Sequence, residues 1–254
     1  MANYKVKRAQ LDALWSYVGN KGEKKDPETD ESGQFWRSTL LDMDTRIPVA
    51  CGIAKDESLA SIAVFQTLKR RGHPDDSPPP IISDGWGGID DAMIAVYGLI
   101  PEYSGRGRPP NRKQAQPNWQ YLQMVKQRDE HGRFQGVKLR VIYGKKDGLI
   151  ELLGKSTAYI ERSNLTSRLF NGRQTRKTLA CSKSLQFPRY AAVWEVSYYN
   201  LARPHKSLRR RIKGAWPQKW LKRTPTMVAR LTDHIWTVQE LLTTLPVPIL
   251  TNTK

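Results

Sequence analysis

The sequence predicts an α/β fold, a sheet of strands flanked by helices, and three stretches of the chain carry this prediction. Apolar, aromatic and β-branched residues between Val6 and Val18 are spaced too irregularly for a helix and favour a central strand. The runs on either side of Asp44-Thr45-Arg46 predict two further antiparallel strands joined by a hairpin turn. The segment PPPIISDGW, followed by IDDAMIAVYGL, is typical of a strand that leads directly into a helix.

The remaining elements follow along the chain. Apolar residues recur at helical spacing from Ser58 to Arg71, and Ser58 is placed to cap this helix. Residues 101–117 are rich in Gly, Pro and basic residues without periodicity, so we expect an exposed loop. The runs YLQMVKQRD and FQGVKLRVIYG flank the turn sequence EHGR and predict a hairpin. Three helices are expected near the C-terminus, around Thr157–Phe170, Phe187–Leu201 and Met227–Leu242.

The charge of the chain indicates a polyanionic partner. Its 254 residues include 42 Lys and Arg against 24 Asp and Glu, a net charge of +18. Composition alone fits a ribosomal or chromatin-like protein as well as an enzyme. Between Glu195 and Asp233 there is no acidic residue, whereas basic residues accumulate, which is typical of a surface that tracks nucleic-acid phosphates.

Other sequence features exclude several classes of protein. Cys51 and Cys181 are far apart and neither belongs to a CxxC pair, so neither a zinc site nor a disulfide framework is indicated. The start MANYKVKRAQ lacks a following apolar segment, and no apolar run approaches the ~18 residues that a membrane helix needs. We therefore expect a soluble cytoplasmic protein without a membrane partner, organised as one main domain with additions.

Three acidic residues are candidates for metal-dependent phosphodiester chemistry. Asp12 lies within a predicted strand, Asp84 at the end of another, and Glu161 on a predicted helix with Asn164 and Arg168 on the same face. Carboxylates suit Mg²⁺ or Mn²⁺, and two such ions about 4 Å apart promote phosphoryl displacement. Each residue also has an ordinary interpretation: a hydrogen-bonded strand residue, an Asp-Gly turn former and a surface helix residue, respectively.

Four motifs carry a resemblance to a known family. The segment IERSNLTSRLFNGRQTRKTLACSKS resembles the region around the catalytic glutamate in DDE transposases of bacterial insertion sequences, specifically the InsB-type group. LDALWSYVG resembles the group's segment around the first aspartate, with Ala13 where Glu is common, and SDGW resembles the segment at the second. YYNLARPHKSL is similar to an element that follows the catalytic glutamate in several of these transposases.

The resemblance implies a fold, a chemistry and a set of cofactors. It implies an RNase H-like domain over residues 1–180, with a mixed five-stranded sheet flanked by helices, a loop and hairpin insertion at about 100–146, and a basic helical extension over 181–254. Asp12, Asp84 and Glu161 would bind Mg²⁺ or Mn²⁺ as two ions. The implied activity is DNA transposition, in which element ends are cut and the freed 3′-hydroxyl attacks target DNA.

The same resemblance places further residues on the DNA. The residues expected to contact phosphates are Arg162, Asn164, Arg168, Arg173, Arg176, Lys177, Arg203, Lys206, Arg209, Arg210 and Arg211. Trp15, Trp36 and Trp86 are expected in the core rather than as base-stacking platforms. His205 is not expected to bind a metal.

Two departures from the family pattern leave alternatives open. The first Asp comes eleven residues after the start, so a separate DNA-reading module or companion polypeptide is expected. The insertion before Glu161 leaves Glu130 and Glu151 as weaker rivals for the third carboxylate. The alternatives are a structure-specific nuclease of the same fold and a catalytically inactive DNA-binding remnant of a mobile element. Pairing of two DNA ends favours a homo-oligomer, associated with the prokaryotic nucleoid.

Overall fold

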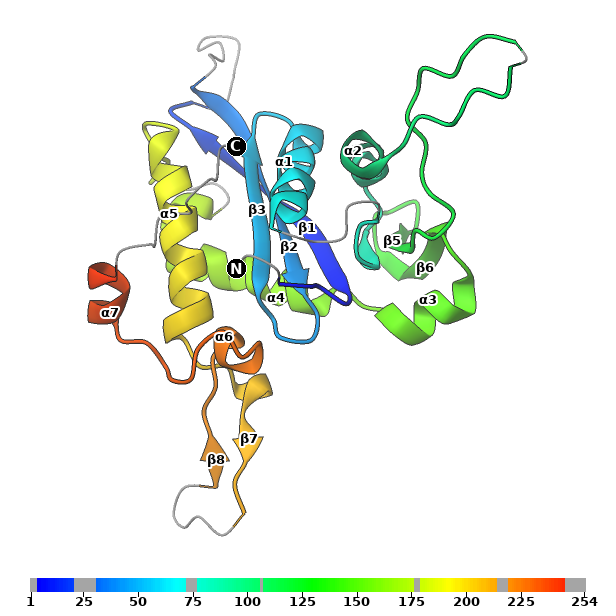
Figure 1. The fold of residues 1–254 in the computed structure, drawn as a ribbon. Helices are drawn as coiled ribbons and strands as arrows, with labels where there is room; N and C mark the ends of the chain where they lie inside the picture. The colour runs from blue at the N-terminus through cyan, green and yellow to red at the C-terminus, as the bar shows by residue number, and fades with distance from the viewer. Residues whose placement is uncertain are drawn as a thin grey trace, which may run out of the picture. The chain divides into compact units, whose positions relative to one another are not determined.

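The computed structural model of the chain describes residues 4–20, 31–71, 77–105, 107–175, 179–213 and 219–244. The chain forms two compact units, an N-terminal unit over Met1–Ala192 and a C-terminal unit over Val193–Lys254 (Figure 1). Within the described residues, no helix is long and apolar enough to cross a membrane.

The N-terminal unit is built on a mixed sheet of six strands in the order β3-β2-β1-β4-β5-β6. The strands are β1 (Ala9–Val18), β2 (Gly33–Asp42), β3 (Pro48–Ala54), β4 (Ile81–Asp84), β5 (Tyr121–Arg128) and β6 (Phe134–Tyr143). The pairs β1–β4 and β4–β5 are parallel, and the other pairs are antiparallel. The expected α/β class is confirmed and β1 is central, as predicted. The expected count of five strands is wrong, because β6 pairs along the outer edge of β5.

Helices cover both faces of this sheet. They are α1 (Glu57–Arg70), α2 (Gly88–Tyr97), α3 (Lys146–Leu153) and α4 (Ala158–Phe170). Helices α1 and α2 pack against each other, and α1 also packs on β2 and β3; α4 packs against β1 and β2 from behind (Figure 1). The α1 contact is close at Gly52, where a Cβ atom would lie 2.1 Å from the carbonyl oxygen of Ala60. Only glycine therefore fits at this point of β3.

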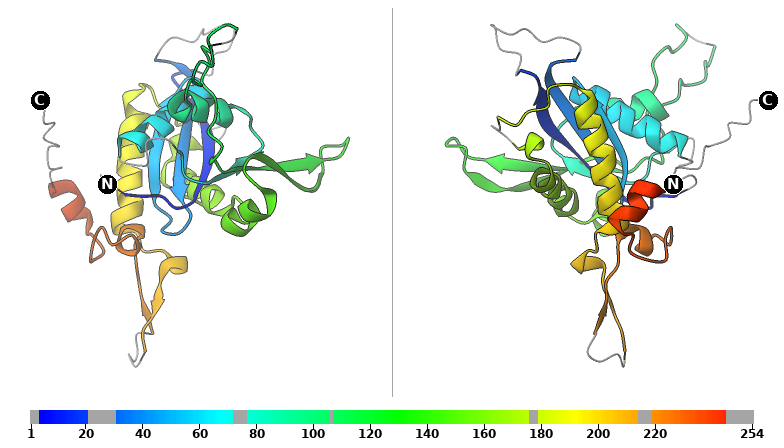
Figure 2. Two further views of the ribbon diagram at one scale, coloured as in Figure 1. Left: turned by 45° about the vertical axis from the view of Figure 1, so that its right-hand side comes forward. Right: turned by 90° about the vertical axis from the view of Figure 1, so that its left-hand side faces the viewer.

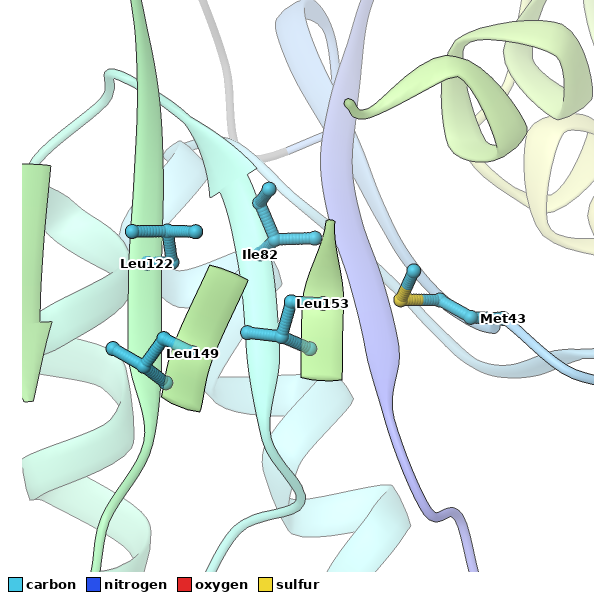
Figure 3. Close-up of a cluster of buried hydrophobic side chains, with 5 residues drawn as sticks. All are labelled: Met43, Ile82, Leu122, Leu149 and Leu153. Carbon is cyan, nitrogen blue, oxygen red and sulfur yellow. The ribbon is translucent and has the colours of Figure 1, made fainter. Parts of the chain in front are cut away.

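Apolar residues on the second face of the sheet hold α3 in place. Met43, Ile82 and Leu122 form a buried cluster with the α3 residues Leu149 and Leu153 (Figure 3). All five side chains are at most 5 % exposed. Burial of a leucine side chain stabilises a fold by about 1.5–3 kcal/mol, so this cluster fixes the chain that leads into α4.

The first helix begins earlier than its pattern predicted. Asp56 is the N-cap of α1, and its carboxylate accepts hydrogen bonds from the backbone N–H groups of Ser58 and Leu59 at 2.7 and 3.2 Å. The expected cap at Ser58 is therefore wrong, because aspartate two residues earlier already satisfies the free N–H groups. As a result, Glu57 lies in the first turn of the helix.

The C-terminal unit consists of short elements. It contains the end of α5 (Gln186–Ser197), a π-helical turn at Tyr198–Ala202, a 3₁₀ turn at Lys206–Leu208, the strands β7 (Arg210–Arg211) and β8 (Trp220–Leu221), and the helices α6 (Pro225–Val228) and α7 (Val238–Thr243). The expected continuous helix over Met227–Leu242 is wrong. Arg230 adopts a positive φ of 59°, which stops α6, and Thr237 starts α7 with a capping box.

Candidate active site

Two of the three predicted carboxylates lie on neighbouring strands. The parallel ladder between β1 and β4 pairs Leu11 with Ser83, so the next residues on the two strands are Asp12 and Asp84. Asp84 is the last residue of β4, at the carboxyl end of its strand as expected. Ligands of α/β sheets commonly bind at this edge, where polar side chains extend beyond the strands.

The third carboxylate is brought to the same edge by α4. Glu161 lies in the first turn of α4. The start of this helix is fixed to β1 by Gln10, which is 1 % exposed. The Gln10 side chain donates to the carbonyl oxygen of Ser156 at 2.7 Å and accepts from the N–H of Ile160 at 2.8 Å. Because Gln10 precedes Asp12 by two residues, it holds the helix next to the strand that carries the first carboxylate.

An open cleft of about 490 Å³ contains all three carboxylates. Its lining consists of Asp12, Ala13, Trp36, Glu57, Asp84, Trp86, Lys126, Thr157, Glu161, Asn164 and Arg168. The rival carboxylates are elsewhere: Glu130 lies in the β5–β6 turn and Glu151 on α3. The three residues that the sequence pattern selected are therefore the ones that the fold brings together.

Hydrogen bonds hold each carboxylate in the cleft. Asn164, one turn after Glu161 on α4, donates to Oδ2 of Asp12 at 2.7 Å. The Nζ of Lys126 and the Oγ1 of Thr157 donate to Oε1 of Glu161 at 3.2 and 3.1 Å. The backbone N–H of Trp86 donates to Oδ1 of Asp84 at 3.2 Å. Each carboxylate thus has its own hydrogen-bond donor, and Asn164 orients the first one.

Negative charges in the cleft repel one another. Burial, followed by repulsion from Asp84, raises the pKa of Asp12 from 3.8 to about 6, although hydrogen bonds from Ala13 and Asn164 oppose the rise. Burial also raises the pKa of Glu57 from 4.5 to about 7, with further contributions from Asp84 and Asp12. Such accumulated negative charge in a cleft is what a bound cation would neutralise.

Glu57, Lys126, Trp36 and Trp86 are site residues that the sequence interpretation missed. Glu57 follows the helix cap and Lys126 lies on a hairpin strand, so neither stands near a motif. The prediction that Trp36 and Trp86 belong to the core is wrong, since both are half-buried and line the cleft. The half-buried Trp15 stacks at a tilt on Tyr17, with ring centroids 5.9 Å apart. The SDGW motif was the available signal for Trp86.

The donor chemistry of the cleft fits a divalent cation. Asp12, Asp84 and Glu161 offer hard carboxylate oxygens of the kind that Mg²⁺ and Mn²⁺ prefer. Among the residues that the structure describes, no three His, Cys, Asp or Glu side chains are already gathered as a metal-binding group. Glu161 is instead paired with Lys126, and Asp12 with Asn164. Binding of a cation would require Glu161 to exchange or share its lysine partner.

The predicted phosphate-binding residues of the N-terminal unit differ in their surroundings. Arg162 is exposed on α4, and Arg168 lines the cleft with a buried Nε for which the described residues supply no hydrogen-bond partner. Arg173 stacks on Phe187, with its guanidinium carbon 5.4 Å from the ring centroid. Asn164 is buried against Asp12. Arg176 and Lys177 lie outside the described residues.

The predicted phosphate-binding residues of the C-terminal unit gather around its two-stranded hairpin. Arg210 and Arg211 form β7, and both are exposed. The guanidinium of Arg209 stacks on Trp220 of β8 at 4.1 Å from the ring centroid. Lys206 is exposed in the preceding turn, and Arg203 is half-buried. His205 packs its ring against Tyr199 at 4.4 Å between centroids.

Fold and site together define an α/β protein with a carboxylate cleft at the edge of a mixed sheet. No protein-family model matches the chain, and no curated protein matches it either. The family that the motifs suggest therefore stays a prediction.

Proposed function

We propose that the chain is a metal-dependent DNA transposase of the DDE class, the enzyme of an insertion sequence. It cuts DNA at the ends of the mobile element and joins the freed 3′-hydroxyl to target DNA. One observation carries the proposal: Asp12, Asp84 and Glu161, which the transposase-like motifs select from distant parts of the sequence, line a single cleft. The strand order and flanking helices are compatible with an RNase H-like fold, which supports the same conclusion.

In this proposal Asp12, Asp84 and Glu161 hold Mg²⁺ or Mn²⁺. When bound, two such ions supply activation of the attacking oxygen and stabilisation of the leaving oxygen. Asn164 keeps Asp12 in a fixed orientation, and Gln10 fixes the helix that carries Glu161. Preorganised carboxylates contribute to rate because side chains need not reorganise during the reaction.

Arg168 is the residue best placed to receive a phosphate group in the cleft. It lines the same cavity as the carboxylates, and its buried Nε finds no partner within the described part of the chain. A buried donor of this kind is normally satisfied by an acceptor, and a phosphate oxygen forms a short charge-assisted bond with arginine. Arg168 would therefore position the scissile phosphate rather than recognise a base.

The DNA partner is supported by the charge of the whole chain. The net charge of +18 favours association with a polyanion, and the exposed arginines of β7 offer a second contact surface. Contacts to phosphates do not distinguish one DNA sequence from another, so a companion module or polypeptide would recognise the element ends. A homo-oligomer would bring two DNA ends together.

The proposal is tested by strand transfer with the purified chain. The substrate is labelled duplex DNA from the borders of the genetic element that encodes it, with plasmid DNA as target and Mg²⁺ or Mn²⁺ present. Joined products that require metal and disappear in Asp84→Ala are the expected result. Asp84→Ala should bind DNA as well as or better than the wild type, because a negative charge is removed from the cleft.

Other outcomes separate the alternative functions. Metal-dependent cleavage of branched DNA without joining would establish a structure-specific nuclease. DNA binding without any chemistry, even after addition of element-encoded companion polypeptides, would establish an inactive remnant. An Asp84→Ala variant that is folded and fully active would remove the carboxylate cleft from consideration.

A further inference from the structure

The hairpin β5–β6 extends beyond the sheet to which it belongs. The parallel ladder between β4 and β5 ends where Asp84 pairs with Met124. From Val125 onward, β5 is paired only with β6, up to the pair Arg128–Phe134. Figure 2 shows these two green strands projecting away from the helices of the N-terminal unit. The projecting part, residues 125–138, is here called the ribbon.

The two faces of the ribbon carry different side chains, because successive strand residues alternate between faces. Lys126 lies opposite Val137. The register shifts by one residue between Gln127 and Arg128, and this bulge brings Phe134 opposite Arg128, so that these four residues share one face. The other face carries the pair Val125–Lys138. Phe134 is 61 % exposed and Val137 is 44 % exposed. One face of the ribbon thus combines two cations with two exposed apolar side chains.

Lys126 makes this face continuous with the carboxylate cleft. It lines the cleft, and its Nζ lies 3.2 Å from Oε1 of Glu161. Its strand neighbour Met124 lies in register with Asp84. Any polymer whose backbone crosses the cleft in the direction of β5 therefore continues along the face that carries Arg128 and Phe134.

Charge decides which polymer fits. The segment from Tyr121 to Tyr143 contains five Lys or Arg residues and two acidic ones. One of the acids, Asp129, is engaged in the turn, where its Oδ1 accepts from the N–H groups of His131 and Arg133 at 3.0 and 2.7 Å. A second copy of this chain, with a net charge of +18, would bring like charge to the ribbon. A nucleic-acid duplex brings the opposite charge.

We propose that the ribbon binds the DNA duplex that flanks the scissile phosphate. Arg128 contacts the phosphate backbone, Lys126 moves between Glu161 and the phosphate nearest the cleft, and Phe134 and Val137 pack against sugars and base edges in the minor groove. Apolar side chains flanked by cations suit this groove, since they contact sugars while the cations contact phosphates on either side. The inference rests on the proposed function for its substrate and adds where the flank of that substrate lies.

The first test is site-specific photocrosslinking in the full-length chain. A benzophenone amino acid replaces Phe134, and in a matched control it replaces Lys138 on the opposite face. One labelled duplex ends at the cleavage site, and the other continues for about one helical turn beyond it. The buffer contains Ca²⁺, so that the test does not depend on cleavage. The expected result is a crosslink from position 134 to the long flank, about tenfold stronger than from position 138. A crosslink from position 134 to a second copy of the chain would overturn the inference.

The second test measures affinity as a function of flank length. Arg128→Ala and Phe134→Ala should each weaken binding of the long-flank duplex by about tenfold, the scale of one lost stacking contact or charge-assisted hydrogen bond. Neither variant should affect the duplex that ends at the cleavage site. Lys138→Ala removes a positive charge from the other face and should leave the effect of flank length intact. Thermal melts confirm that each variant is folded.

The outcomes distinguish the inference from the proposed function. The wild-type chain could bind long flanks more tightly, lose this preference in Arg128→Ala and Phe134→Ala, and yet never cleave or join DNA. That result would uphold the ribbon as a DNA-binding surface and overturn the proposed activity. Efficient strand transfer with equal affinity for short and long flanks would uphold the activity and overturn the ribbon as a DNA-binding surface.

Discussion

The carboxylate cleft of the N-terminal unit and the basic hairpin of the C-terminal unit are built in opposite ways. The cleft brings together Asp12 and Asp84 from two strands of the sheet and Glu161 from a helix that packs on it. The hairpin presents neighbouring residues of the sequence on β7 and β8, each two residues long. Metal-dependent chemistry needs fixed distances, whereas attraction to phosphates needs only charge, and the two regions differ in construction accordingly.

The contacts in each region reflect this difference. In the cleft, Gln10 alone makes two hydrogen bonds to the segment around the start of α4. In the hairpin, Arg209 stacks on Trp220, and Nε of Arg223 donates to the carbonyl oxygen of Leu208 at 2.7 Å. Arg210 and Arg211 are exposed. Substitutions in the cleft should therefore affect rate, and substitutions in the hairpin should affect binding.

The largest effect is expected from Glu161→Gln. The substitution removes the charge but keeps the size of the side chain and the hydrogen bond from Thr157. Residues that only support metal ligands already contribute about ten- to a hundredfold to affinity or activity. Loss of a ligand itself should therefore slow strand cleavage by more than about a hundredfold. DNA affinity should be unchanged or higher. Single-turnover cleavage and a binding isotherm measure the two quantities. Glu151→Gln, at an exposed position of α3, is the matched control. If this control also cleaved slowly, the loss of rate in Glu161→Gln would not be specific to the cleft.

A smaller effect, confined to binding, is expected when Arg209, Arg210 and Arg211 are replaced together by Ala. Each phosphate contact contributes about 0.9 to the slope of log affinity against log salt, so the slope should fall by up to about 2.7. The cleavage rate at saturating DNA should not change. Titrations between low and physiological salt measure the slope. A triple Arg→Lys variant keeps the charge and should keep the slope; an unchanged slope in the Ala variant would place the DNA elsewhere.

Gln10→Leu should affect both stability and rate, because Gln10 lies in the core yet positions the site. The substitution leaves the Ile160 N–H and the Ser156 carbonyl without their partner, which costs about 1–3 kcal/mol in the free energy of unfolding. Displacement of α4 should also slow cleavage by about tenfold. Denaturant unfolding and cleavage kinetics measure these effects. Gln66→Leu on the exposed side of α1 is the control, and equal results for the two variants would contradict the positioning role.

The smallest effect is expected from Glu57→Gln, and it should stabilise the protein. The pKa of Glu57 is raised from 4.5 to about 7 in the folded state, so the folded protein binds more protons and loses stability as the pH rises through this window. The glutamine variant has no group that ionises here, so its stability does not fall in this pH range. It should be about 1–2 kcal/mol more stable at pH 8 without metal, since one pKa unit corresponds to about 1.4 kcal/mol before solvent screening.

The comparison with pH 4 makes this result specific. There Glu57 is mostly protonated in both states, so the variant and the wild type should unfold at similar denaturant concentrations. Unfolding curves at the two pH values, with Glu151→Gln beside them, test the sign. A gain that is equal at both pH values would indicate better packing and not relief of repulsion.

The sequence predicted most of the elements that carry the site. Apolar runs bounded by turn residues located β1 to β4, and the turn after Asp84 marked its position at a strand end. Local patterns have no access to the register between strands, so the closeness of Asp12 to Asp84 followed only from the family motif. Glu57 and Lys126 were missed because their approach to the cleft depends on packing between elements distant in sequence.

The C-terminal unit shows where periodicity misleads. Apolar residues over 227–242 fit a helix, but the backbone turns at Arg230 and a new helix starts only at Thr237. The structure instead satisfies Thr224 and Thr226 with buried hydrogen bonds, including one from Thr226 to the carbonyl oxygen of Asn200 at 2.6 Å. A tertiary contact of this kind outweighs helix propensity in a short segment.

The absence of a side chain at Gly52 lets α1 pack closely on the sheet. A methyl group there would meet the Ala60 carbonyl oxygen at 2.1 Å and the Ala63 side chain at 2.9 Å, and α1 would have to lift from the sheet. Glu57 stands in the first turn of that helix, so the same movement would carry its carboxylate away from Asp12 and Asp84. The missing side chain on the edge strand β3 thus lets Glu57 add its negative charge to the cleft that holds Asp12 and Asp84.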